Sequence, residues 1–371
     1  MYKNLAAAFA AASVVATVWA QGPATPKLPQ SPASPPALKA AFVYLTPVLD
    51  AGWTRQHDEG RRALQQALGT RVQTSAVDSV PEGADAERVL RDLAASGNRL
   101  IFTTSFGYTE PVMRVARDFP QVKFESVTGF KRADNVATAN ARYYEGRYLS
   151  GIAAARASKT GVAGFVVGFP IPEVLQGINA FTLGMRSINP QATVKVVWLD
   201  TWFDPPRERE AAMALFNENV DVVSFQVAST AVMQAAQERG RMAIAYHSDM
   251  RKDGPDAQLL AVTHQWGDYY TARARAVLDG AWKSQDTWGG VREGMIRVEG
   301  FGPRLPAAAR QEVLQRQQQM AEGRLHPFQA GAQPIRDNQG RIRIPAGERL
   351  TDAQILQMDW LAEGVQARLP Q

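Results

Sequence analysis

One stretch decides the fold that the sequence predicts: Ala41-Phe-Val-Tyr-Leu-Thr-Pro-Val-Leu-Asp50-Ala-Gly-Trp53-Thr-Arg-Gln-His-Asp-Glu-Gly60. A short apolar run typical of a β-strand stops at Pro47, a turn containing glycine follows, and a helix then begins. In open α/β sheets, ligands bind where a strand ends in a loop that leads into a helix. We therefore expect Asp50 and Trp53 at a loop that holds a planar, hydrogen-bonding molecule.

The same arrangement recurs at Leu100-Ile-Phe-Thr-Thr-Ser-Phe106-Gly-Tyr108, where two aromatic residues follow another apolar strand. Other aromatic and hydrogen-bonding side chains also stand at the ends of predicted strands: Phe169, Trp202, Gln226, Ser248, Asp249 and Trp266. Each of them alone is also compatible with a place in the core or in loop packing. Because strand ends of a parallel sheet converge on one edge, their joint placement predicts a cleft whose aromatic side chains bind flat rings by stacking.

The order of the elements predicts an α/β protein. From Leu38 onward, short apolar strands alternate with helices, as in buried parallel sheets that are covered by helices on both faces. The pattern has two halves, which predict two doubly wound parallel-sheet lobes joined by a hinge. We expect the first lobe at residues 38–141 plus about 258–285 and the second at 142–257. Residues 286–371 are expected to form a return crossover and a C-terminal extension with a helix, a hairpin and a last helix capped by Thr351.

The N-terminus has the features of a secretory signal. Lys3 precedes an apolar, alanine-rich run, and small residues stand before Gln21. The alternative is a membrane anchor, but the apolar run is shorter than the roughly 20 residues that a membrane-spanning helix needs. We expect residues 1–20 to be cleaved and 21–37 to be a flexible spacer rich in Pro, Ala and Ser. This predicts an exported, periplasmic protein.

The composition argues against several functional classes. The chain has no cysteine, which excludes disulfides, thiolate metal sites and an N-terminal lipid anchor through cysteine. The net charge of +5 is spread along the chain without a Lys/Arg block, so no nucleic-acid partner is expected. The four histidines lack metal-ligand spacing, and phosphate-loop, nucleophile-elbow and dinucleotide motifs are missing. We therefore expect no cofactor and no metal. The missing motifs remove the common catalytic reactions and do not rule out an enzyme, although none is expected.

The ordered motifs resemble the basic membrane protein (BMP/Med) family of ABC-transporter substrate-binding proteins. The resemblance covers about residues 38–370 and rests on Asp50-Ala-Gly-Trp53, Ser105-Phe-Gly-Tyr108, Tyr144-Glu-Gly-Arg-Tyr-Leu-Ser-Gly, Gly177-Ile-Asn-Ala-Phe-Thr-Leu-Gly, Tyr246-His-Ser-Asp-Met250, Gln265-Trp-Gly-Asp and Met358-Asp-Trp-Leu-Ala-Glu-Gly364. It implies a type I periplasmic-binding-protein fold, a purine base or nucleoside as ligand, and an ABC permease in the inner membrane as partner.

The resemblance also implies roles for individual residues. Trp53 and Phe106 would sandwich the base, and Asp249, with Ser248 nearby, would read the ring edge. Some members carry Asn where Thr54 stands here, together with acids that hold ribose and a lysine, and that lysine has no clear match in this sequence. A free base is therefore expected rather than a nucleoside.

Three functions remain open at this point. The first is a monomeric, periplasmic binding protein that delivers a purine-like ligand to an ABC importer. The second is a ligand-responsive sensor or regulatory protein built on the same clamp. The third is an exported nucleoside hydrolase, which the lack of an acidic cluster in the first loop disfavours.

Overall fold

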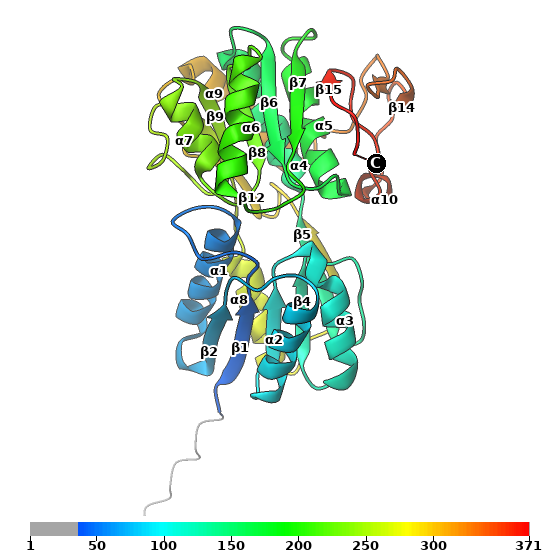
Figure 1. Cartoon of the computed structure of the whole chain (residues 1–371). Coiled ribbons are helices and arrows are strands. Elements are labelled where there is room, and N and C mark those ends of the chain that lie inside the picture. The colour runs from blue at the N-terminus through cyan, green and yellow to red at the C-terminus, as the bar shows by residue number, and fades with distance from the viewer. Residues whose placement is uncertain (1–35, 371) are drawn as a thin grey trace, which may run out of the picture. The chain divides into compact units, whose positions relative to one another are not determined.

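The computed structural model describes residues 36–370. The expected signal peptide and nearly all of the expected spacer therefore lie outside the described residues. Ala37–Gln371 form one compact unit, and the α/β class with two parallel-sheet lobes is confirmed (Figure 1).

The first lobe is built on a six-stranded, all-parallel sheet. Its strands, in spatial order, are β11 (Asp286–Gly289), β5 (Val136–Ala141), β4 (Lys123–Val127), β3 (Leu100–Thr103), β1 (Leu38–Val43) and β2 (Val72–Val77). Because side chains alternate along a strand, Phe42 packs on the face of α1 (Trp53–Leu68) and α8 (Gly267–Leu278), whereas Val43 packs with α2 (Ala84–Ala95) and α3 (Thr109–Asp118). Helices therefore cover both faces.

The second lobe is built on a seven-stranded sheet in which β12 alone is antiparallel among the described strands. The order is β12 (Ile296–Glu299), β10 (Gln258–His264), β9 (Met242–His247), β8 (Val222–Gln226), β6 (Val162–Val167), β7 (Thr193–Trp198) and β15 (Val365–Gln366). Its helices are α4 (Tyr143–Ala157), α5 (Pro172–Arg186), α6 (Pro205–Asn217), α7 (Ala231–Glu238) and α9 (Ala307–Ala321).

Small residues let α4 and α5 pack closely. A Cβ atom at Gly151 would lie 2.1 Å from the carbonyl oxygen of Phe181, and one at Gly184 would lie 2.1 Å from that of Tyr148. The run of small residues in α4 is thus a backbone-to-backbone contact surface, in the way that close helix packing requires.

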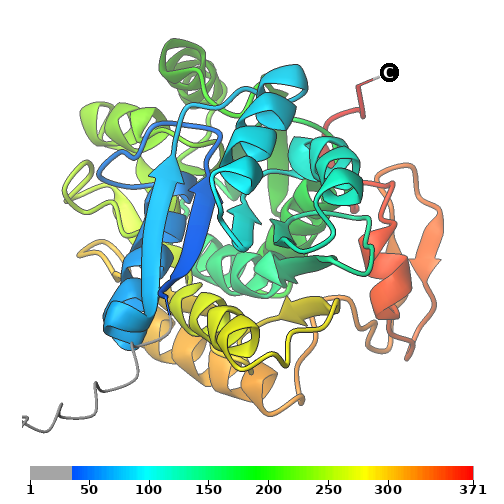
Figure 2. The ribbon, with the colours of Figure 1, turned by 90° about the horizontal axis from the view of Figure 1, so that it is seen from below.

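One expectation about the lobes was wrong. The strand at residues 258–264 was expected in the first lobe, but β10 pairs in parallel with β9 in the second sheet. The chain returns to the first lobe only afterwards, where α8 packs beside α1 (Figures 1 and 2) and β11 pairs with β5. The sequence did not reveal this because β10 is apolar and fully buried, and such a run fits either sheet.

Within residues 36–370, three connections link the lobes: β5 to α4, β10 to α8, and β11 to β12. These crossings produce two lobes that are interleaved along the chain. The three connections together form the hinge region, because they are the segments in which the chain passes from one sheet to the other.

The C-terminal extension belongs to the second lobe (Figures 1 and 2). The expected hairpin is present as β13 (Ile335–Arg336) and β14 (Ile342–Ile344), and Thr351 caps α10 (Asp352–Leu356) in a capping box with Gln354. The extension ends by pairing β15 with the edge strand β7.

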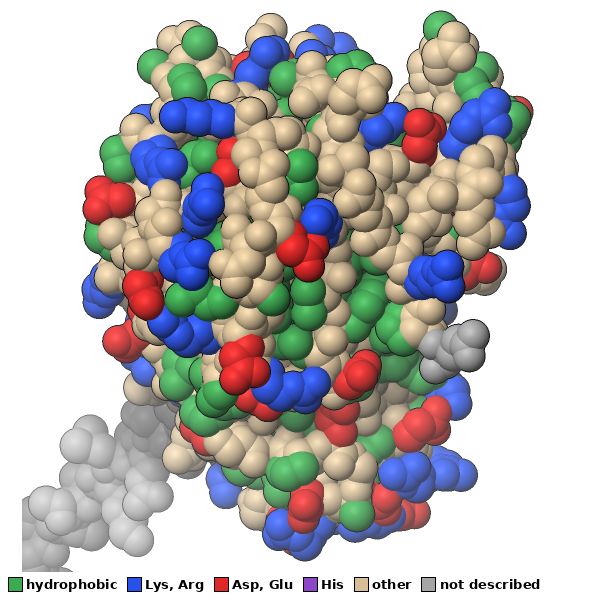
Figure 3. Space-filling view, turned by 45° about the horizontal axis from the view of Figure 1, so that its top comes forward, with side chains coloured by type: hydrophobic (Ala, Val, Ile, Leu, Met, Phe, Trp, Pro, Cys, Tyr) green, Lys and Arg blue, Asp and Glu red, His purple; other side chains and the backbone are tan. Residues whose placement is uncertain are grey.

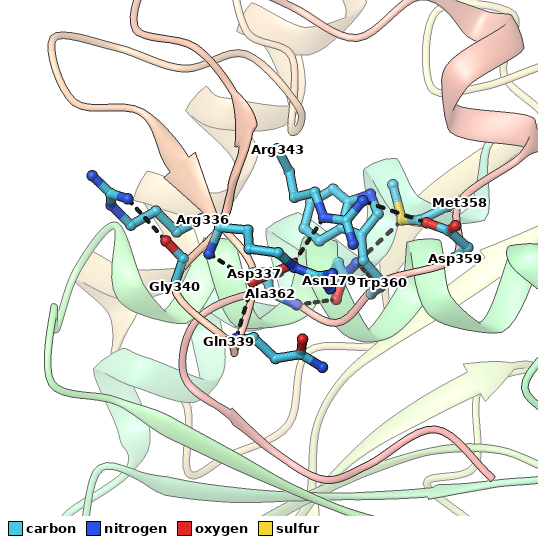
Figure 4. A network of polar contacts seen from close by, with 11 residues as sticks. Asn179, Arg336, Asp337, Gln339, Gly340, Arg343, Met358, Asp359, Trp360 and Ala362 are labelled. Carbon is cyan, nitrogen blue, oxygen red and sulfur yellow. Dashed lines mark hydrogen bonds and ion pairs between the residues drawn. The ribbon is translucent and has the colours of Figure 1, made fainter. Parts of the chain in front are cut away.

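A buried amide of α5 fastens this extension to the lobe. The Nδ2 atom of Asn179 donates to the carbonyl of Trp360 at 2.8 Å, and its Oδ1 accepts from the backbone N–H of Ala362 at 2.7 Å (Figure 4). Asp337 in the hairpin turn accepts hydrogen bonds from Arg341 and Arg343 at 2.8 and 2.9 Å. The extension is therefore held by specific polar contacts as well as by packing.

The surface carries charges of both signs. Figure 3 shows Lys/Arg and Asp/Glu side chains interspersed over one face. Several form pairs one helical turn apart, such as Arg55 with Glu59 at 2.8 Å. Among residues 36–370, every helix is too short or too polar to cross a membrane.

Candidate ligand-binding site

A cavity lies between the carboxyl ends of the two sheets, and both lobes line it. The first lobe contributes Leu45, Thr46, Trp53, Thr104, Ser105, Phe106 and Thr128. The second lobe contributes Ile171, Glu173, Trp202, Gln226, Val227, Ala228 and His247. The space is about 520 Å³ when the open solvent at its mouth is included.

Three aromatic residues that the sequence singled out line this cavity: Trp53, Phe106 and Trp202. The indole Nε1 of Trp53 donates to the carbonyl of Thr104 at 2.8 Å, which ties the start of α1 to the end of β3. Phe106 stacks on Phe130, with ring centroids 4.8 Å apart, and 54% of Phe130 is exposed. The cavity therefore has aromatic walls whose orientations are fixed by neighbouring groups.

Phe169 supports one of these walls without lining the cavity. Its ring packs edge-on against Trp202 at a centroid distance of 5.1 Å. Both Phe169 and Trp202 were predicted to bind ligand, and of the two only Trp202 lines the cavity.

A carboxylate that the sequence analysis missed lies at the cavity. Glu173, in the first turn of α5, accepts hydrogen bonds from Asn140 of the first lobe and from Gln226 of the second, both at 3.0 Å. Gln226 was expected here; its amide also lines the cavity. Burial raises the pKa of Glu173 to about 7, against the opposing effect of the two amide donors and of Arg147. Removal from water disfavours the charged form, so this carboxyl titrates near neutrality.

Residue 173 could have been found from its neighbours. The sequence Gly168-Phe-Pro-Ile-Pro-Glu173 follows a buried strand and places proline at the first helical position. That is the same strand–loop–helix arrangement that identified the Trp53 loop. The prediction for this loop selected the aromatic residue Phe169 and did not include Glu173.

His247 is the second polar group that was missed. It lines the cavity at the end of β9 and has a backbone φ of 73°, a left-handed conformation that is uncommon for a residue with a side chain. Its Nδ1 lies 2.8 Å from Nε2 of His264, whose Nδ1 in turn receives a hydrogen bond of 2.6 Å from the indole N–H of Trp266.

This chain of contacts determines which ring nitrogens carry protons. Burial lowers the pKa of His264 to about 3 and that of His247 well below its usual value, so both rings are neutral. An indole N–H can only donate, so His264 accepts at Nδ1 and carries its proton on Nε2. His264 therefore donates to Nδ1 of His247, which leaves His247 with an N–H donor at Nε2. The indole N–H of Trp266 thus sets the tautomer of His264 and, through it, that of His247.

Two other predicted contacts are core residues instead. Trp266 is 1% exposed and is absent from the cavity lining. Tyr108 is fully buried, and its hydroxyl donates to the carbonyl of Val80. Both were expected to contact ligand because they follow strands. Trp266 instead packs against Tyr270 of the first lobe and bonds His264 of the second, and Tyr108 packs in the core of the first lobe. Burial of a large apolar ring is more favourable than its exposure.

The predicted role of Asp249 disagrees with the structure. Asp249 is absent from the cavity lining, and its carboxylate is held by Arg251 at 2.8 Å and by Gln258 at 2.9 Å. Partial burial opposes ionisation, but the hydrogen bonds from Arg251 and Gln258 prevail and lower its pKa. The residue caps a local turn, because an arginine two positions later takes up the carboxylate that was assigned to the ligand. Asp50 also stays outside, on an exposed loop.

Ser248 joins the lobes at the side of the cavity. Its Oγ accepts from the N–H of Gly52 at 3.0 Å and lies 3.2 Å from the Gly52 carbonyl, to which it donates. Gly52 has a φ of 98°, and a Cβ atom there would lie 2.5 Å from the carbonyl oxygen of Ala228. Only glycine allows the first lobe to approach the second this closely. Ser248 is therefore an interlobe contact and not a cavity-lining residue.

The histidines and acids near the cavity are arranged for hydrogen bonding with their neighbours. No group of three or more His, Asp or Glu residues among residues 36–370 is arranged to hold a metal ion. The histidine rings beside the cavity are engaged with one another, with Trp266 and with Tyr270, whose hydroxyl lies 2.6 Å from Nδ1 of His57.

Solved structures resemble the chain in fold. A solute-binding protein of an ABC transporter from Aeropyrum pernix K1 aligns with a TM-score of 0.66 and 20% identity, covering 78% of this chain and 93% of that one. A transcriptional activator of the comK gene from Bacillus halodurans aligns with a TM-score of 0.65 and 22% identity, covering 78% and 100%. At these identities the likeness shows the type I periplasmic-binding-protein fold alone.

Sequence relatives point to the family. A purine-binding protein of Brucella abortus is 47% identical over 334 residues, which is 90% of this chain and 94% of that protein. A protein of Haloferax volcanii, whose name provisionally assigns it to glucose binding for an ABC transporter, is 34% identical over 81% of this chain and 76% of its own length. The sequence profile of the Bmp family, described as ABC transporter substrate-binding protein PnrA-like, matches residues 37–325. The chain therefore belongs to the Bmp family of ABC-transporter substrate-binding proteins.

Proposed function

We propose that this substrate-binding protein takes up a purine base in the interlobe cavity and delivers it to an ABC permease in the inner membrane. The observation that carries the proposal is the cavity itself, in which aromatic walls from both lobes enclose an acceptor, Glu173, and a donor, His247. Flat heterocycles present stacking faces together with hydrogen-bonding edges, and this set of groups suits both features.

The name of the Brucella abortus relative supports a purine as ligand. The name of the Haloferax volcanii relative favours a sugar instead, so glucose belongs in any test. The three aromatic side chains that line the cavity can stack on the faces of a flat ring, while Glu173 and His247 can pair with its edge.

A free base is preferred over a nucleoside. Thr54 is buried, and its hydroxyl pairs with that of Thr46 at 2.6 Å, so Thr54 is not available to a ribose. Among the lining residues, Glu173 is the acid, and its position between Asn140 and Gln226 suits a ring edge.

Delivery to a permease requires export, which the signal-like residues 1–20 support. The alternative remains a ligand-responsive sensor that uses the same clamp. Both functions need binding without turnover, and they differ in the partner that recognises the closed lobes. Pull-down of the cognate permease with loaded and with ligand-free protein separates them.

The direct test is titration calorimetry of the purified mature chain against adenine, guanine, hypoxanthine, adenosine and glucose. We expect a free purine to bind most tightly. Base–aromatic stacking contributes roughly 1–3 kcal/mol, so Trp53→Ala should weaken purine binding by about 5- to 150-fold.

A matched control for this variant is Phe119→Ala, which removes an aromatic ring at the end of α3 that is not part of the cavity lining. Tight binding of glucose with no response to purines would refute the proposal. So would an unchanged purine affinity in folded Trp53→Ala protein.

A further inference from the structure

We propose that Glu173 selects between purines by its protonation state: the ionised carboxylate favours a guanine-like edge and the neutral acid favours an adenine-like edge. This inference rests on the proposed function and adds to it a pH-dependent choice of base.

The carboxyl group is held in one orientation from two sides. Asn140, on β5 of the first lobe, donates to Oε2, and Gln226, on β8 of the second lobe, donates to Oε1, both at 3.0 Å. A carboxylate has about four acceptor positions on its two oxygens. The two amides therefore leave further positions for a ligand in the cavity that Glu173 lines.

The chemistry of the two forms differs in a way that matches purine edges. An ionised carboxylate only accepts, and it pairs best with two adjacent donors, such as a ring N–H beside an exocyclic amino group. A neutral carboxylic acid has one O–H donor and one carbonyl acceptor. It pairs with an amino donor next to an unprotonated ring nitrogen, which is the arrangement of N6 and N7 in adenine.

Burial brings the change of state into the accessible pH range. It raises the pKa of Glu173 to about 7, and the charge of Arg147 on α4 opposes this rise. Arg147 has its own pKa lowered to about 10 by burial and stays charged near neutrality. The carboxyl therefore changes charge while its fixed cationic neighbour does not.

The other groups that face Glu173 do not titrate in this range. Tyr143 on α4 and Tyr246 on β9 have pKa values raised by burial and remain neutral. Beside this group, His247 lines the same cavity and His264 is bonded to it, and burial lowers the pKa of both rings, which keeps them neutral. A change in base preference near neutral pH is therefore assigned to Glu173.

The experiment measures adenine and guanine binding to the wild-type mature chain at about pH 5.5 and about pH 8, on either side of the pKa of Glu173. The ratio of adenine affinity to guanine affinity should fall by at least about tenfold from the lower to the higher pH. Calorimetry in buffers of different ionisation enthalpy should also show proton uptake when adenine binds above neutrality.

Glu173→Gln supplies the first variant. Its amide carries a donor and an acceptor at every pH, so the ratio should no longer depend on pH and proton uptake should vanish. Glu145→Gln is the matched control, because burial also raises the pKa of Glu145 to about 7, but this residue lies outside the cavity lining and bonds the backbone of Val291. It should keep the wild-type pH dependence.

A ratio that stays constant with pH in the wild-type protein would overturn the inference and leave purine binding standing. Loss of the pH dependence in Glu145→Gln would also overturn it. Failure of both bases to bind at either pH would instead refute the proposed function. The wild-type measurements do not depend on whether a variant folds, so the inference stays open to refutation in every case.

Discussion

Two carboxylates of the second lobe, Asp249 and Glu173, stand beside the ends of buried strands, yet their surroundings are opposite. Asp249 lies near the surface, where Arg251 and Gln258 hold it and lower its pKa. Glu173 meets only neutral amides at hydrogen-bonding distance, and burial raises its pKa to about 7. The same functional group is thus a turn cap in one place and a titrating group that lines the cavity in the other. The partners and the access to water decide the role.

The sharpest way to break this comparison is to truncate each acid in turn. Glu173→Ala leaves the amides of Asn140 and Gln226 and the donors of the ligand without a partner. Hydrogen bonds to charged groups are worth about 1.5–3 kcal/mol, so purine affinity should fall by about 10- to 150-fold. Asp249→Ala should leave affinity within about twofold of wild type. Titration calorimetry on both variants measures these affinities. A larger loss of purine affinity with Asp249→Ala than with Glu173→Ala would identify Asp249 as the acid that contacts the ligand.

A second prediction concerns stability as a function of pH. The pKa of Glu173 is higher in the folded chain, about 7, than its ordinary value of 4.5. The folded state therefore binds more protons between these values, and the free energy of unfolding falls as pH rises through this window. Glu173→Gln should remove part of that fall, which makes the ligand-free variant more stable than wild type by on the order of 2 kcal/mol above the window.

Chemical denaturation at about pH 4 and about pH 8 measures this effect. The matched comparison is Asp249→Asn. The pKa of Asp249 is lowered in the folded state, so its contribution is present above an ordinary pKa of 3.8 and is lost only as pH falls further. If Asp249→Asn had a higher free energy of unfolding than wild type above neutral pH, and Glu173→Gln did not, the contrast drawn between the two acids would be wrong.

The third prediction tests the donor that balances the acceptor. Trp266→Phe removes the indole N–H that holds the proton of His264 on Nε2, so His247 no longer has a fixed donor at the cavity. Purine affinity should fall by about 3- to 10-fold. The ¹⁵N shifts of His247 and His264 should show mixed tautomers, a change that mere loss of packing does not produce.

Trp282→Phe is the control for this variant. It removes an indole N–H that bonds Glu125 in the first lobe, away from the cavity. Unchanged histidine ¹⁵N shifts in Trp266→Phe would refute the relay.

The smallest effect is expected from Asp249→Asn near neutral pH. This partly exposed pair with Arg251 is of the kind that contributes little to stability. The melting temperature should drop by only about 1–2 °C, with purine affinity unchanged. A tenfold loss of affinity, measured by calorimetry, would restore Asp249 as a ligand-reading residue.

The sequence predicted the architecture well because the signals are local. Alternation of short apolar strands with helices indicates parallel sheets, and the aromatic residues at 53 and 106 line the cavity. The strand at 258–264 was assigned to the wrong lobe because a fully buried strand carries no mark of the sheet it joins. The polar half of the site was missed for a similar reason. Whether an acid faces a ligand or an arginine depends on contacts such as those of Asn140 with Glu173, which come from separate lobes.

The strand β15 has a consequence for how the protein is made. It pairs with β7 from the last few residues of the chain, and Asn179 fastens the segment just before it. A growing chain therefore carries β7 as an open edge until residues 365–366 are synthesised, and an open edge is a template for association with other chains. Premature termination near the C-terminus would thus yield an aggregating product, although every residue of the cavity would be present.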